Sequence, residues 1–111
     1  LAALCDAAAC VPADVHAWLG PCIGATAFEV GADVVEAFGA DPRCFVPRPR
    51  ADGAMRWFAN LPQLGRDRLT AQGVSKISGG TWCTVTDRSR FFSFRRDGSR
   101  SGRMAAAIWL R

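Results

Sequence analysis

The residues Phe91 to Arg111, FFSFRRDGSRSGRMAAAIWLR, contain two apolar runs on either side of a loop that begins with Asp97-Gly98. Apolar runs around an Asp-Gly pair are typical of a β-hairpin. Because side chains alternate along a strand, Phe92 and Phe94 should share one face. Met104 should lie on the corresponding face of the second strand. This pattern predicts a terminal hairpin with its phenylalanine face toward the core.

The same hairpin would bring Arg95 and Arg103 to one end, beside a loop that also carries Arg96 and Arg100. A guanidinium group is planar and permanently charged, so it matches the shape of phosphate. We therefore take Arg95, Arg96 and Arg103 as candidates for binding phosphate or substrate. An equally favoured alternative is that Arg95 and Arg103 pair with carboxylates while the other arginines are solvated.

The composition indicates one globular domain or part of one. The chain has 111 residues, half of them hydrophobic, which is enough to form a core. Its net charge is +4, with one lysine, Lys76, among 14 cationic residues. An arginine-rich, alanine-rich chain can reflect the coding genome, so this charge is weak evidence for nucleic-acid binding.

The cysteines and the single histidine restrict the chemistry. The five cysteines are odd in number, with no CxxC pair, which predicts reduced thiols in the cytoplasm. His16 has no second histidine with which to share a metal ion. Cys22 lies in a glycine-rich loop without a neighbouring histidine, so we favour a structural thiol over a nucleophile. No apolar run has the length of a membrane span.

The chain opens within a helical pattern: Leu1, Leu4, Cys5 and Ala8 follow the spacing of an amphipathic helix, with no capping residue before them. We therefore expect the chain to be a fragment of a longer protein.

The rest of the chain predicts an α+β fold with a mixed or antiparallel sheet and helices on the outside. Asn60 should cap a helix that has Pro62 in its first turn. Residues 41–56 contain four arginines and several prolines, which predicts an irregular, mobile loop. The remaining expected elements are a strand at 15–19, a helix at 32–38 ended by Gly39, and strands at 74–77 and 81–85.

Four stretches together resemble a known protein family, the YfiH or laccase-domain family of polyphenol-oxidase-like proteins, now regarded as purine nucleoside phosphorylases. They are LGPCIG at 19–24 with FEVG at 28–31, NLPQL at 60–64 leading to Gly73-Val74, Cys83-Thr84, and FFSFRRDG at 91–98 continuing through GRMA at 102–105 to IWL at 108–110. The resemblance covers nearly the whole chain in the right order. It corresponds to the C-terminal half of the family's single domain.

The resemblance implies a layered α/β/β/α domain that cleaves adenosine, inosine and methylthioadenosine with phosphate and deaminates adenosine as a side activity. It also implies a zinc site whose two histidines and one cysteine lie in the N-terminal half. We therefore assign no catalytic residue and no metal ligand to residues 1–111, and expect this chain alone to be inactive. The expected partners are nucleoside, phosphate and that N-terminal half.

Three other functions stay open. Copper-dependent oxidation of phenols has little support, because the chain offers no cluster of imidazole and thiolate ligands. An arginine-rich nucleic-acid-binding module would need exposed aromatic side chains beside the arginines. A purely structural role is the third. The sequence also departs from its relatives at Ala27, where cysteine is frequent, and at Phe28 and Phe94, where tyrosine is common.

Overall fold

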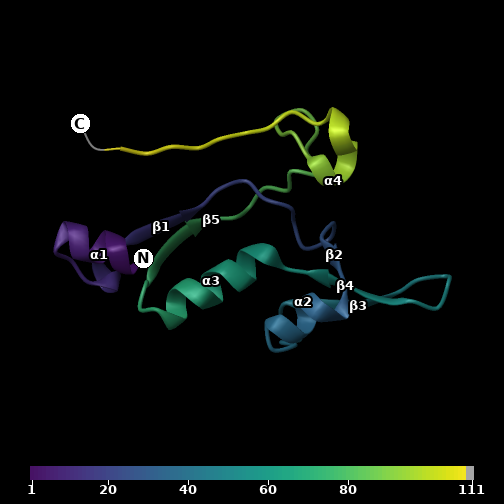
Figure 1. The fold of residues 1–111 in the computed structure, drawn as a ribbon, viewed down its shortest axis with the longest axis horizontal. Coiled ribbons are helices and arrows are strands. Elements are labelled where there is room, and N and C mark those ends of the chain that lie inside the picture. The colour runs from purple at the N-terminus through teal and green to yellow at the C-terminus, as the bar shows by residue number, and fades with distance from the viewer. Residues whose placement is uncertain (110–111) are drawn as a thin grey trace.

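Two small β-sheets and four α-helices make up the mixed α/β fold of residues 1–109, which is the part of the chain that this computed structural model describes (Figure 1). The sheets are a parallel pair, β1–β5, and an antiparallel sheet in the order β2–β4–β3. In chain order the elements are α1 (Ala2–Ala8), β1 (His16–Leu19), β2 (Glu29–Val30), α2 (Ala32–Ala37), β3 (Phe45–Pro49), β4 (Met55–Ala59), α3 (Leu61–Ala71), β5 (Lys76–Gly79) and α4 (Phe94–Asp97), with short 3-10 helices at Pro12–Asp14 and Gly98–Arg100.

The predicted helices are confirmed at residues 2–8, 32–37 and 61–71. Gly39 follows α2 with φ of 77°, which is the left-handed conformation that ends many helices. Asn60 caps α3: its Oδ1 accepts a hydrogen bond of 3.1 Å from the backbone N–H of Gln63. None of the helices within residues 1–109 has both the length and the apolar character that crossing a bilayer requires.

The parallel pair joins residues about 60 positions apart in the sequence. His16 is paired with Lys76 and Leu19 with Gly79. Arg66 of α3 supports this pair by donating hydrogen bonds to the carbonyl oxygens of Ile77 and Gly79. Both faces of the strand predicted at residues 15–19 are apolar or aromatic, which is typical of a strand with neighbours on both sides. Among the described residues β1 instead pairs only with β5, and Trp18 is 55% exposed.

The core lies where α2 and α3 meet the antiparallel sheet. Val30, Phe45 and Ala59, one residue from each strand, are buried together with Cys44 and Leu64. Val34 and Val35 of α2 and Trp57 of β4 pack against this cluster. The core is small, and β4, paired on both edges, is its central strand.

Residues 41–56 are not the irregular loop that their prolines predicted, because β3 and β4 form a hairpin there. At either end of this hairpin, the Arg50 N–H donates to the Ala54 carbonyl and the Asn60 N–H donates to the Cys44 carbonyl. In this register the backbone N–H and C=O groups of the even-numbered residues of β3 point toward β4. Pro47 and Pro49 are odd-numbered, so the positions without N–H groups point away from the ladder. β3 is an edge strand, where proline is tolerated.

The terminal hairpin predicted for residues 91–111 is wrong over the residues that the structure describes; the last two of its residues lie outside them. Ser93 caps a four-residue helix, accepting a hydrogen bond from Arg96 N–H, so the chain turns where a strand was expected. Residues 101–109 run extended along one side of the molecule without a strand partner in the described chain (Figure 1). Consequently Phe92 and Phe94 do not face the core: they are 54% and 60% exposed.

The predicted strand at 81–85 is also absent. Only Cys83 makes a bridge there, pairing with Cys22 in the parallel sense. The chain turns immediately afterwards, and the Asp87 N–H donates to the carbonyl oxygen of Cys83.

Asn60→Ala should lower the free energy of unfolding by about 1 kcal/mol, because it leaves the Gln63 N–H at the start of α3 without its acceptor. Asn60→Asp keeps an acceptor at this position and should retain most of the stability. Urea denaturation of both variants measures the difference. Equal midpoints for Asn60→Ala and the unsubstituted chain would contradict the capping role.

Candidate functional site

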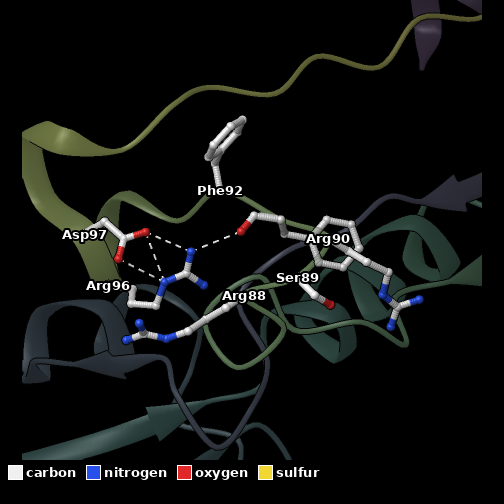
Figure 2. A pocket seen from close by; sticks show the side chains of 7 residues that line it. Arg88, Ser89, Arg90, Phe92, Arg96 and Asp97 are labelled. Atoms are coloured by element: carbon white, nitrogen blue, oxygen red, sulfur yellow. Dashed lines mark hydrogen bonds and ion pairs between the residues drawn. The ribbon is translucent and has the colours of Figure 1, made fainter.

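An arginine-lined pocket lies between residues 88–92 and α4, with a volume of about 380 Å³. Figure 2 shows its side chains, which come from the loop after Cys83 and from the short C-terminal helix. The lining residues are Arg88, Ser89, Arg90, Phe91, Phe92, Arg96 and Asp97. Its lining contains three guanidinium groups and one carboxylate, so the net charge of the pocket is positive. A positive charge favours the binding of an anion.

Arg96 holds the two walls of the pocket together. Its Nη1 donates to the carbonyl oxygens of Thr84 and Val85 at 2.9 and 3.0 Å, and its Nη2 donates to that of Phe91 at 3.1 Å. Nε and Nη2 also donate to the Asp97 carboxylate (Figure 2). The side chain is only 10% exposed. All three guanidinium nitrogens therefore already have protein acceptors.

Asp87 organises the loop on the other side. Its carboxylate accepts hydrogen bonds from the Ser89 hydroxyl at 2.9 Å and from the Arg90 backbone and guanidinium. The bonds from Arg90 and Ser89 lower the pKa of the Asp87 carboxyl below its ordinary value. The Arg90 guanidinium also lies 5.7 Å from the ring centre of Trp82 and 5.5 Å from that of Phe91. Arg90 is thus held by an ion pair and two aromatic rings.

Arg88 is the lining arginine with unused hydrogen-bonding capacity. It is exposed, and among the described residues it makes no hydrogen bond or ion pair within bonding distance. Its charge nevertheless reaches Asp97, whose carboxyl pKa it helps to lower after the larger effect of Arg96. A free guanidinium beside a positively charged pocket is suited to binding phosphate or carboxylate.

The arginines predicted from the sequence do not surround a single pocket. Arg95 donates to the backbone carbonyl of Glu29 at 3.0 Å and lies over the ring of Phe28. Arg103 donates to the carbonyls of residues 101 and 102 and lies over Phe94. Both are exposed, and neither forms an ion pair within residues 1–109. Of the three, Arg96 alone lines the pocket of Figure 2.

Arg88 and Arg90 were not among the residues predicted to form a site. They flank Ser89 directly after Asp87, and this alternation in DRSR was the available signal. It was missed because the loop appeared to be only a connection to the predicted hairpin.

The described residues do not fit a zinc or copper site. Asp41, Cys44 and Asp67 do place one ligand atom each within 4.8 Å of one another. However, Arg43 forms ion pairs with both carboxylates, at 2.6 and 3.3 Å. The Cys44 thiol donates to Asp67 at 3.7 Å, and burial raises the pKa of this thiol, which favours its protonated form. A metal ion would have to displace an arginine and a proton from a set that lacks imidazole.

Arg96→Ala should lower the melting temperature by about 5 °C or more, because it leaves three carbonyl oxygens and a carboxylate without their donor. Arg96→Lys should lose nearly as much, since a single ammonium cannot reach all four acceptors. Arg88→Ala serves as the matched control and should melt within about 1 °C of the unsubstituted protein. Scanning calorimetry measures all three, and an unchanged melting temperature for Arg96→Ala would contradict this role.

The ion pair of Asp97 with Arg96 should make stability depend on pH in the acid range. Hydrogen bonds from Arg96 lower the pKa of Asp97 from 3.8, so the pair stabilises the folded protein fully above that value. The stabilisation disappears as the pH falls through the lower folded-state pKa. Asp97→Asn should therefore reduce the melting temperature at pH 7 and show a smaller further decrease between pH 5 and pH 2. Ser99→Ala is the control, and a variant whose pH profile parallels that of the unsubstituted protein would contradict the prediction.

Comparison with known proteins places this chain in a family. The family described as multi-copper polyphenol oxidoreductase laccase matches residues 1–111. The chain is 45% identical over 104 residues to purine nucleoside phosphorylase YfiH of Escherichia coli, and 43% identical over 101 residues to a purine nucleoside phosphorylase of Haemophilus influenzae. These matches cover 89% of this chain but only 40% and 41% of the relatives.

Two solved structures agree with the sequence matches. The protein NMB0706 of Neisseria meningitidis matches with a TM-score of 0.61 at 41% identity, over 73% of this chain and 34% of that one. YlmD of Geobacillus stearothermophilus matches with a TM-score of 0.67 at 28% identity, over 84% and 36%. The chain spans about two fifths of the length of the curated relatives that it matches. It belongs to the laccase-like, YfiH family of proteins.

Proposed function

We propose that this chain is the C-terminal portion of a single-domain purine nucleoside phosphorylase of the YfiH type. The observation that carries this proposal is identity of 43–46% over about nine tenths of the chain with several proteins of that name. The proposed substrates are adenosine, inosine and methylthioadenosine, with deamination of adenosine as a second activity. The five free thiols are consistent with a reducing, cytoplasmic location.

The exposed surface of the chain supports its being one part of a larger domain. The accessible surface is 7886 Å², whereas about 5,900 Å² is expected for a compact monomer of this mass. The radius of gyration of 16.4 Å likewise exceeds the roughly 13 Å of a compact domain of this length. Ile108 and Trp109 are 97% and 73% exposed. We propose that the remainder of the domain covers this apolar C-terminal segment.

Within the complete domain, the chain would supply groups that hold the anionic co-substrate. Phosphorolysis requires phosphate to be held against the anomeric carbon of the ribose, and guanidinium groups neutralise its charge and fix its orientation. Arg88, Arg95 and Arg103 are exposed and have N–H groups free to bind phosphate. Arg96 has a different proposed role: it positions the loop that carries Arg88 and does not itself contact phosphate.

The zinc implied by this function would be bound outside the chain. Asp41, Cys44 and Asp67, whose ligand atoms lie close together, are already engaged by Arg43 and by one another. Copper-dependent phenol oxidation is the alternative that the family description names. It also would need ligands from outside residues 1–109, whose one histidine is hydrogen-bonded to Ser78 at 3.0 Å.

A second candidate function is single-stranded nucleic-acid binding, which the exposure of Phe92 and Phe94 favours. One consideration weighs against it: the Arg103 guanidinium lies 5.1 Å from the centre of the Phe94 ring and covers one face. We therefore rank this function below phosphorolysis.

The decisive experiment uses the full-length protein that contains this chain, incubated with inosine and inorganic phosphate. Hypoxanthine and ribose 1-phosphate should appear together, and omission of phosphate should abolish both. Oxidation of a phenol with consumption of dioxygen, in the absence of phosphorolysis, would favour the copper alternative. Binding of single-stranded DNA without either activity would favour the nucleic-acid alternative.

Arg88→Ala and Arg103→Ala in the full-length protein should each raise the KM for phosphate about ten-fold, because each removes one charge-assisted contact. Melting temperatures should change little, since neither arginine forms an ion pair within residues 1–109. Arg100→Ala removes an exposed arginine that is not among the three proposed to bind phosphate, and it should leave the KM unchanged. An Arg103→Ala protein that melts much lower with unaltered phosphate dependence would show that Arg103 is structural.

A further inference from the structure

Two cysteines distant in the sequence lie side by side next to the parallel sheet. Cys22 and Cys83 are backbone partners in an isolated parallel bridge. The Thr84 N–H donates to the Cys22 carbonyl at 2.9 Å, which fixes this register. Both side chains are half-buried and both thiols are free.

The bridge gives the two thiols a spacing that a disulfide can span. Paired residues of neighbouring strands are about 4.8 Å apart, and disulfides join Cα atoms about 4.4–6.8 Å apart. Side chains of an in-register pair leave the same face of the pleat, so the two Cβ atoms point in a common direction. The backbone would need no large movement to form the bond.

The two thiols differ in their surroundings. The Gly24 N–H donates to Cys83 Sγ at 3.1 Å. Burial acts on Cys83 to raise its pKa, but hydrogen bonds from Thr86, Gly24 and Val85 together outweigh it and lower the pKa. Burial raises the pKa of Cys22, and the neighbouring Cys83 adds to this effect. Cys83 therefore forms a thiolate more readily than Cys22 does.

Gly24 allows this arrangement because it has no side chain. A Cβ atom at position 24 would lie 3.0 Å from Cys83 Cβ and 3.2 Å from Cys83 Sγ. Either the sulfur or the loop would have to move, and the N–H donor would be withdrawn from the sulfur. Gly24, the last residue of the LGPCIG stretch, therefore donates a hydrogen bond to the sulfur of a cysteine 59 residues later in the chain.

We propose that Cys83 and Cys22 form a peroxide-reactive thiol pair, with Cys83 as the nucleophile and Cys22 as the resolving thiol. The Cys83 thiolate attacks one oxygen of hydrogen peroxide, breaking the O–O bond and giving a sulfenic acid and hydroxide. The Cys22 sulfur then attacks the Cys83 sulfur; the S–O bond breaks, and the hydroxyl leaves with the Cys22 proton as water. The hydroxide takes up the proton that the Cys83 thiol lost on ionising, so two thiols are oxidised to one disulfide and one peroxide is reduced to two waters.

The chain contains a matched control in Cys5 and Cys10. These two are also close together, since the Cys10 N–H donates to the Cys5 carbonyl. Burial and the neighbouring Cys5 raise the pKa of Cys10, however, and no donor to either sulfur comes from another segment of the described chain. Proximity alone would make the two pairs react alike, whereas the proposal requires the Cys22–Cys83 pair to react faster.

The experiment treats the full-length protein with hydrogen peroxide, blocks the remaining thiols with iodoacetamide and digests without reductant at aspartate. Cleavage before each aspartate puts every cysteine of the chain in its own peptide, with Cys22 in residues 14–32 and Cys83 in residues 67–86. We expect these two peptides to be recovered cross-linked, at least about ten-fold faster than those carrying Cys5 and Cys10. Equal rates for the two pairs, or no cross-linked peptide, would overturn the proposal.

Two variants assign the roles within the pair. Cys22→Ser should leave a sulfenic acid on Cys83 that dimedone traps, whereas Cys83→Ser should abolish fast oxidation at Cys22. Gly24→Ala should slow the modification of Cys83 by iodoacetamide in the folded protein and leave the rate in 8 M urea unchanged. Sulfenic acid appearing on Cys22 in the Cys83→Ser protein at the unsubstituted rate would reverse the assignment.

Discussion

The buried guanidinium of Arg96 is the interaction on which the C-terminal third of the structure depends. It joins the carbonyls of Thr84, Val85 and Phe91 to the Asp97 carboxylate, so one side chain fixes a loop with few backbone hydrogen bonds of its own. The backbone of this region is too irregular to satisfy these carbonyls by sheet or helix pairing, and a buried carbonyl without a donor is costly. The five N–H groups of arginine supply what secondary structure does not.

This arrangement divides the arginines into two groups with different tasks. Arg96 and Arg90 are held by carboxylates, carbonyls and aromatic rings, and they shape the walls of the pocket. Arg88, Arg95 and Arg103 keep N–H groups directed at solvent, and they are the ones available to an anion. Neighbouring arginines in one motif, Arg95-Arg96, thus belong to different groups. Arg96 fixes the loop that carries Arg88, whereas Arg95 and Arg103 are held by backbone carbonyls and by the rings of Phe28 and Phe94.

The small core and the large exposed surface both support the proposal that this chain is one part of a larger domain. The antiparallel sheet and α2 enclose only a few buried side chains, while residues 104–109 are extended and mostly exposed apolar groups. Such a segment gains stability only when another surface covers it. The thiol pair follows the same principle on a smaller scale: Gly24 and Cys83 come from separate loops, and their contact gives the sulfur one of its donors.

The sequence alone determined three of the helices and the family. Helical spacing, the Asn60 cap and the glycine after α2 predicted three helices correctly, because these signals act within a few residues. It could not determine the edge position of β3, which makes Pro47 and Pro49 acceptable, or the turn at Ser93 that replaces the predicted hairpin. It also could not separate Arg96 from its neighbours or bring Cys22 to Cys83. Those features depend on which distant backbone groups meet, and tertiary structure alone decides that.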